Sequence, residues 1–146
     1  MVVSEAEALE WVRHTFETEL PVARLLGARP LACDPKAGRL TVEFTPRPEF
    51  LNLLGWIQGG ILTAMLDMAM SFAVLCTLDR QHVVPSLEIK TSYLAPAKLA
   101  PVIGEGILLR RGRAIAFMEG RLTDTDGNLL TTASGTGQIR PRPART

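Results

Sequence analysis

The sequence predicts an α+β fold in which a curved antiparallel sheet wraps around one long buried helix, with a further helix at the N-terminus. One observation behind this prediction is an apolar run from Gly59 to Leu78, whose only charged residue is Asp67. The other is a series of strand-like segments joined by short turns, because short turns make neighbouring strands antiparallel. A sheet with one apolar face must cover that face, and the apolar run is the only candidate to do so.

The N-terminal helix is expected within residues 1–20. Ser4 and Glu7 have the spacing of a capping box, apolar residues follow at helical intervals, and Pro21 ends the pattern. The other face of this segment is acidic, so the helix is expected at the surface. Residues 21–38 contain several prolines and glycines and are expected to be irregular.

Strands are predicted where apolar and polar residues alternate. In the segment 39–44, Leu40, Val42 and Phe44 share one face. The later strands are predicted over Ser86–Leu94, Val102–Arg111, Ala114–Thr123 and Leu129–Ile139, the middle two joined by a tight hairpin. The tail, residues 140–146, is expected to be disordered. The whole chain, 1–146, is expected to form one domain.

Composition narrows the classes of function. Charged residues make up 21% of the chain and the net charge is +1, which gives no field suited to nucleic acid. Two cysteines are too few for a disulfide framework, and Cys76 within the apolar run is expected to be an inert core residue. A secretion signal is not recognisable, so a cytoplasmic location is expected.

The sequence gives little support for a metal site, for several other classes of enzyme or for a membrane-spanning helix. His14 and His82 lack the spacing of metal ligands, so no metal site is expected. The sequence has no nucleophile elbow of a serine hydrolase, dinucleotide fingerprint or P-loop. The apolar run is long enough to span a membrane, but Asp67 at its centre opposes insertion. A buried core helix is therefore favoured, and no contact with a membrane is expected.

The same run contains the candidate site. A carboxylate such as Asp67 is costly in apolar surroundings unless it is used or paired. The run opens with Gly59 and Gly60, whose backbone N–H groups at a helix start can hold developing negative charge. Asn52 lies shortly before them. An acid within a helix and an oxyanion site at a helix start are parts of a hydrolytic centre.

Each of these residues also has a purely structural explanation. Asp67 could satisfy a buried donor, Gly59 could serve loop-to-helix packing, and Asn52 could be an ordinary turn residue. The sequence leaves these alternatives open.

The stretch from Asn52 through Gln58-Gly59-Gly60 to Asp67, followed by Ser86 and the segment 93–96 (YLAP), resembles the hotdog-fold acyl-CoA thioesterases of the phenylacetic-acid-degradation type. Members of that family typically have an Asn, a His-Gly-Gly six residues on, and an acid nine residues after the His. The resemblance covers residues 38–140.

The resemblance implies hydrolysis of an acyl-CoA thioester to a carboxylic acid and free CoA, without a metal or redox cofactor. It makes Asp67 the nucleophile or the general base and the Gly59 N–H the oxyanion donor. Asn52 would hold the water or the sulfur end of the thioester, and Ser86 would hydrogen-bond near the acid. The roles of nucleophile and general base remain open for Asp67.

Gln58 is the one departure, because it stands where the family has histidine. Glutamine donates and accepts hydrogen bonds but cannot carry a proton between steps. We therefore expect Gln58 to position the loop and the substrate carbonyl. The alternatives are a hotdog hydratase or dehydratase, disfavoured because these generally rely on a catalytic histidine, and a non-catalytic dimer that binds acyl-CoA.

Two expectations concern groups outside the acid and the loop. Arg111 and Arg113 lie at the hairpin turn, where they could hold CoA phosphates or simply be solvated. Gly59 and Asp67 are eight residues apart, roughly 12 Å along one helix, so one carbonyl cannot reach both. We therefore expect a homodimer or a dimer of dimers, with antiparallel helices and active sites at the subunit interface.

Overall fold

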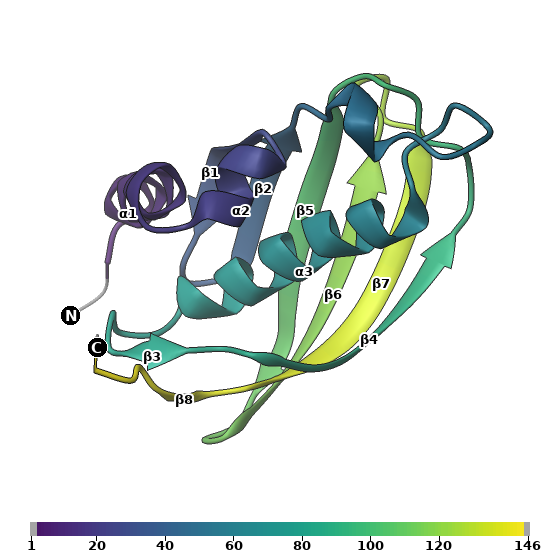
Figure 1. Cartoon of the computed structure of the whole chain (residues 1–146). Helices are drawn as coiled ribbons and strands as arrows, with labels where there is room; N and C mark the ends of the chain where they lie inside the picture. The colour runs from purple at the N-terminus through teal and green to yellow at the C-terminus, as the bar shows by residue number, and fades with distance from the viewer. Residues whose placement is uncertain (1–2, 145–146) are drawn as a thin grey trace.

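The computed structural model describes residues 3–144, in which a curved six-stranded sheet lies against the helix α3, Gly59–Leu75 (Figure 1). The strand order is β1-β2-β5-β6-β7-β4, and every neighbouring pair is antiparallel. The predicted α+β class is thereby confirmed. The strands are β1 (Ala28–Asp34), β2 (Arg39–Phe44), β4 (Ser86–Tyr93), β5 (Val102–Arg111), β6 (Ile115–Thr123) and β7 (Leu129–Gln138).

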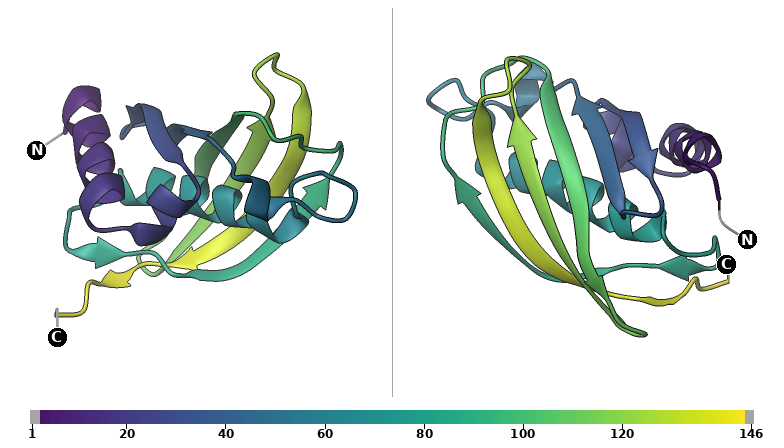
Figure 2. Two further views of the ribbon diagram at one scale, coloured as in Figure 1. Left: turned by 45° about the horizontal axis from the view of Figure 1, so that its top comes forward. Right: turned by 180° about the vertical axis from the view of Figure 1, so that it is seen from behind.

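The N-terminal helix α1, Glu5–Thr18, begins at the predicted capping box. The Ser4 hydroxyl accepts from the Glu7 N–H, and the Glu7 carboxylate accepts from the Ser4 N–H in return. These two hydrogen bonds satisfy donors that a helix start would otherwise leave open. Figure 2 shows α1 at the β1 edge of the sheet, so the flank of the sheet is covered there.

The prediction of an irregular segment over residues 21–38 is wrong. It contains the short helix α2, Pro21–Leu25, and the strand β1. Pro21 occupies the first turn of α2, where a missing N–H costs nothing. Pro30 is tolerated in β1 because this strand lies at the edge of the sheet and has a bulge between Pro30 and Ala32.

The prediction of a disordered tail over residues 140–146 is also wrong for the first residues of that tail. β8, Arg140–Pro141, pairs with β3, His82–Val83. Arg142 donates from its backbone to the Gln81 carbonyl and from its side chain to Glu19. These contacts hold in place a segment for which the composition alone predicted no ordered structure. Residues 145 and 146 lie outside the described part of the chain.

The core lies between α3 and the concave face of the sheet. Gly106 permits the closest approach, because a Cβ there would clash with the Ala69 carbonyl oxygen of α3. At Gly120 a Cβ would meet the side chains of Leu66 and Met70 at 2.9 Å. Two glycines on neighbouring strands thus let the backbone of α3 settle onto the sheet.

A single chain does not cover the helix on every side. Most residues of α3 that face the sheet are buried, but one side is covered less completely by this chain. We call this side the open stripe; it consists of the exposed Gly60 and the half-buried Thr63, Ala64, Asp67 and Ser71. Their spacing of three to four residues places them on one face of the helix.

None of the helices within residues 3–144 combines the length and the apolar character needed to cross a membrane.

We predict that Gly106→Ala lowers the free energy of unfolding by about 3 kcal/mol, because the added methyl group meets helix backbone that cannot move aside. Chemical denaturation at fixed protein concentration measures this change. Gly112→Ala is the matched control, since its Cβ would lie 3.4 Å from the Ile115 carbonyl oxygen, an ordinary contact. Equal stability of the two variants would contradict the assigned role of Gly106.

Candidate active site

Asp67 lies near the middle of α3 on the open stripe, half-buried rather than fully buried as its surroundings in the sequence suggested. Its Oδ1 accepts a hydrogen bond of 2.5 Å from the Ser86 hydroxyl and a longer one of 3.3 Å from the Ser71 hydroxyl. Ser71 is one helical turn further on, whereas Ser86 is brought to the acid by the start of β4. The two hydroxyls orient the carboxylate, and Oδ2 has no hydrogen-bond partner among the described residues.

A short closed loop precedes the helix. It follows the 3-10 turn η1, Pro48–Phe50, and is closed by a bridge between Leu51 and Ile57. The Asn52 side-chain oxygen accepts from the backbone N–H groups of Leu54 and Trp56. The turn explanation of Asn52 thus accounts for its Oδ1. Its amide nitrogen makes no hydrogen bond within the described residues and remains as a donor for other chemistry.

The helix starts at Gln58, whose backbone carbonyl accepts from Ile61 and Leu62. The Gln58 side chain is exposed and does not cap the helix. The N–H groups of Gly59 and Gly60 have no backbone or side-chain acceptor within the described residues. Two donors at a helix start are therefore available to an oxyanion.

Tyr93 fixes the geometry of this first turn, a role that the sequence prediction missed. Its hydroxyl donates to the Gly59 carbonyl oxygen at 2.9 Å and lies 2.6 Å from the Thr63 hydroxyl. A Cβ on Gly59 would approach the Tyr93 ring to 2.9 Å, so the packing explanation of Gly59 is also correct. A Cβ on Gly60 would meet no described atom within 4 Å. The alternation of β4 placed Tyr93 on the helix-facing side, but nothing in the sequence indicated its hydrogen bonds.

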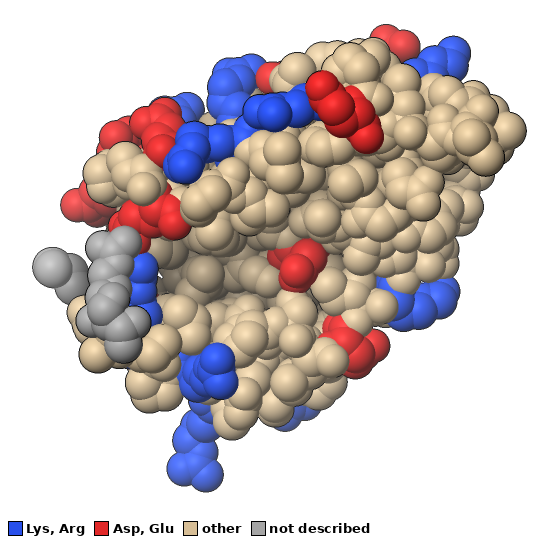
Figure 3. Space-filling model, viewed as in Figure 1, with Lys and Arg blue, Asp and Glu red and all other residues tan. Residues whose placement is uncertain are grey.

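A pocket of about 350 Å³ opens beside the first turn of α3. Apolar side chains dominate its wall, as is usual for sites that take organic ligands. Figure 3 shows the surrounding face as mostly uncharged, with an acidic group near its middle. The pocket is lined by Asn52, Trp56, Ile57, Gly59, Leu62 and Tyr93, and by residues 94–97.

The predicted residues thus fall into two groups within one chain. Asn52, Gln58 and Gly59 lie together at the start of the helix, and Asp67 and Ser86 lie together at its middle. Asp67 is absent from the lining of the pocket beside Gly59. Eight residues of helix, roughly 12 Å, separate the groups. No single small carbonyl can touch both.

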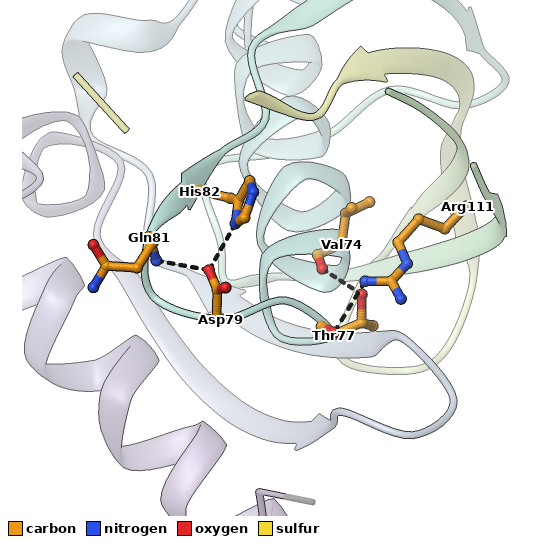
Figure 4. Close-up of polar contacts among 6 residues, drawn as sticks. All are labelled: Val74, Thr77, Asp79, Gln81, His82 and Arg111. Atoms are coloured by element: carbon orange, nitrogen blue, oxygen red, sulfur yellow. Dashed lines mark hydrogen bonds and ion pairs between the residues drawn. The ribbon is translucent and has the colours of Figure 1, made fainter. Parts of the chain in front are cut away.

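The two arginines predicted to bind phosphates lie elsewhere. Arg111 donates to the Thr77 carbonyl oxygen at 3.2 Å, just beyond the C-terminal end of α3 (Figure 4). A cation is favourable there because carbonyl groups at a helix end carry partial negative charge. Arg113 is exposed in the β5–β6 turn. Neither is brought to Asn52 or Gly59 by this chain.

The turn after α3 is held by a small polar network, also seen in Figure 4. The Thr77 hydroxyl donates to the Val74 carbonyl oxygen. His82 lies 2.6 Å from the Asp79 carboxylate, which also accepts from the Gln81 N–H. The bond from His82, and then that from Gln81, lowers the pKa of Asp79. This network keeps the end of the helix in place, away from the candidate site.

Residues 3–144 contain no group of three or more His, Cys, Asp or Glu side chains arranged to hold a metal ion.

The fold and the site residues define a class of protein. A sheet curved around one central helix, with a loop and a glycine pair at the helix start, is the hotdog fold. The family model for the thioesterase superfamily matches residues 54–131, which is more than half of the chain. The chain belongs to the thioesterase superfamily.

Individual proteins agree with this assignment. A protein of Saccharolobus solfataricus to which esterase activity is ascribed is 32% identical over 102 residues, covering 70% of this chain and 72% of that protein. Acyl-coenzyme A thioesterase 13 of Homo sapiens is 28% identical over 126 residues, covering 85% of this chain and 84% of that protein. The crystal structure of a phenylacetic acid degradation-related protein of Ralstonia eutropha JMP134 has 35% identity and a TM-score of 0.79, covering 86% of this chain and 96% of that one.

Proposed function

We propose that the protein hydrolyses an acyl-CoA thioester to a carboxylic acid and free CoA. One observation carries the proposal: Asp67, the only charged residue of α3, lies on the open stripe with one oxygen held by Ser86 and the other unpartnered among the described residues. An oriented carboxylate with a free oxygen is suited to attack a carbonyl or to take a proton from water. Membership of the thioesterase superfamily and the similarity to acyl-coenzyme A thioesterase 13 support this reaction.

The proposed mechanism assigns a role to each group. Asp67 either adds directly to the thioester carbon or deprotonates the water that adds to it. The carbonyl oxygen becomes negative in that step, and the Gly59 N–H at the helix start stabilises it. The carbon–sulfur bond then breaks, CoA leaves as a thiolate and takes up a proton. With direct attack, water must afterwards hydrolyse the anhydride formed on Asp67.

The neighbouring residues support these steps by position. The Asn52 amide is proposed to hold the water or the sulfur end of the thioester, while its oxygen keeps the loop closed. Gln58 is proposed to orient the substrate carbonyl, which needs hydrogen bonds but no proton transfer. Tyr93 fixes the carbonyl of Gly59 and so the direction of the Gly60 N–H in the same peptide unit.

We further propose that two chains build each site. The Gly59 N–H and Asp67 are separated by about 12 Å of helix within one chain. Antiparallel packing of two open stripes across a two-fold axis would bring the Gly59 end of one helix level with Asp67 of the other. Because a two-fold interface is isologous, it would form two equal sites. Leu53 and Leu54 support this arrangement, since both are strongly exposed in the loop beside Gln58.

The direct test measures thiol release from a panel of aliphatic and aromatic acyl-CoAs with a thiol reagent. We expect at least one substrate to yield free CoA and carboxylic acid in equal amounts. Loss of enoyl absorbance without thiol release would indicate a hydratase. Saturable acyl-CoA binding with no reaction would indicate a non-catalytic binder. Either result would overturn the proposal.

We predict that Asp67→Asn lowers kcat at least about 100-fold on the best substrate of the panel, because the amide is neither a nucleophile nor a base. Circular dichroism and the melting temperature should show that the fold survives, since size and shape are kept. Asp79→Asn is the matched control, as it makes the same chemical change in the turn beyond α3 and should keep normal turnover. Normal turnover by Asp67→Asn would eliminate the proposed mechanism.

The shared site is tested by mixing two inactive variants, Asp67→Asn and Asn52→Ala, and letting the subunits exchange. Random exchange makes half of the dimers mixed, and each mixed dimer has one intact and one doubly altered site. We therefore expect about one quarter of the wild-type activity to return. Each variant exchanged with itself is the control. A mixture that stays inactive after exchange has been demonstrated by mass would show that each site is built by one chain.

A further inference from the structure

The two cysteines of the chain lie side by side although 43 positions separate them in the sequence. Cys33 comes from β1 and Cys76 follows the last turn of α3. Their sulfur atoms are 2.8 Å apart, and both thiols are free and buried, with exposed fractions of 4% and 3%. A disulfide needs about 2.05 Å between the sulfurs, so a further approach of roughly 0.8 Å would close the bond.

The surroundings favour ionisation of one thiol. The hydrogen bond with Cys76 lowers the pKa of Cys33, and the positive charge of Arg80 acts in the same direction. The same hydrogen bond and burial raise the pKa of Cys76. Arg80 is held in place by stacking on the Trp11 ring, 4.1 Å from its centroid. Cys33 is therefore suited to be the attacking thiolate, and Cys76 is suited to remain the neighbouring thiol.

A small molecule can approach this pair from the side of Cys76. A pocket of about 420 Å³ opens next to Cys76, on the opposite end of α3 from Gly59. Its volume far exceeds that of a hydroperoxide group. Its lining consists of Val3, Pro35, Lys36, Cys76, Thr77, Leu78 and Asp79. The candidate active site contributes no residue to it.

We propose that Cys33 and Cys76 are a reversible oxidation site, at which a hydroperoxide converts the buried thiol pair into an intramolecular disulfide. With hydrogen peroxide as the hydroperoxide, the Cys33 thiolate attacks one peroxide oxygen, the O–O bond breaks, and Cys33 becomes a sulfenic acid. The leaving hydroxide takes up the proton that the Cys33 thiol had lost and departs as the first water. The sulfur of Cys76 then attacks the Cys33 sulfur, the S–O bond breaks, and the proton of Cys76 leaves with the hydroxyl group as a second water. Two thiols lose two electrons, and hydrogen peroxide is reduced to two waters.

The disulfide would tie β1 to the end of α3. Its closure encloses the chain from Cys33 to Cys76, which includes β2, the closed loop and the whole of α3. A cross-link over so long a segment stabilises a protein mainly by restricting the unfolded chain. We expect the oxidised form to melt at least about 5 °C higher than the reduced form.

The test treats the folded protein with a small excess of hydrogen peroxide and counts free thiols after denaturation. We expect both thiols to disappear together and both to return with dithiothreitol. Peptide mapping should show a Cys33 peptide joined to a Cys76 peptide, at a mass two hydrogens below their sum. Because the chain has only these two cysteines, no other disulfide within one chain can explain that product.

Cys76→Ala is the matched variant, since it keeps Cys33 but removes the thiol that resolves the sulfenic acid. Here Cys33 should be oxidised beyond sulfenic acid and should not be recovered by dithiothreitol. Loss of only one thiol in the wild-type protein, a disulfide between two chains, or reaction only after unfolding would each overturn the proposal. An unchanged melting temperature of the cross-linked form would overturn the assigned effect on stability.

Discussion

The contact between the backbone of α3 and the concave face of the sheet determines most of this structure. It depends on Gly106, where any side chain would strike the Ala69 carbonyl oxygen, and on Gly120 in the neighbouring strand. Only with the helix this close can the apolar side of α3 be buried against the sheet face formed by β2, β5, β6 and β7. The same contact fixes the rotation of the helix about its axis, and so decides which side remains open.

The candidate site is a consequence of that rotation. The side of α3 turned away from the sheet carries Asp67, and the edge strand β4 begins where Ser86 can reach its carboxylate. At the other end of the same strand, Tyr93 reaches back to Gly59. One edge strand therefore holds both the acid at the middle of the helix and the donors at its start. Movement of β4 would disturb both groups at once.

Local patterns were sufficient to predict the elements whose signals lie within a few residues. The capping box of Ser4 and Glu7, the apolar run of α3 and the alternation in β2 and β4 are of this kind. So are the turns that bound β5, β6 and β7. β1 was missed because Pro30 argues against a strand unless its edge position is known. β8 was missed because its order comes from pairing with β3, about 57 residues earlier in the sequence.

In the candidate site too, some features could be predicted from the sequence and others could not. The spacing of Asn52, Gly59 and Asp67 could be seen in the sequence, and so could the expected distance between the latter two. The hydrogen bonds of Ser86 and Tyr93 could not be derived from spacing, because they join β4 to α3 across the fold. The same holds for Cys33 and Cys76. The sequence suggested that Cys76 is inert, whereas the structure places a second thiol against it.

The loop held by Asn52 has a further consequence for molecular recognition. One side-chain oxygen fixes two backbone N–H groups, and Gly55 supplies the left-handed backbone conformation that the turn needs, with φ of 77°. Leu54 takes part in these bonds through its backbone N–H alone, and the side chains of Leu53 and Leu54 are not needed for them. The loop is thus ordered before anything docks on it, and binding there forfeits little conformational entropy. Its shape and its apolar surface can consequently change independently: replacing the leucines would alter what the loop recognises while its backbone stays the same.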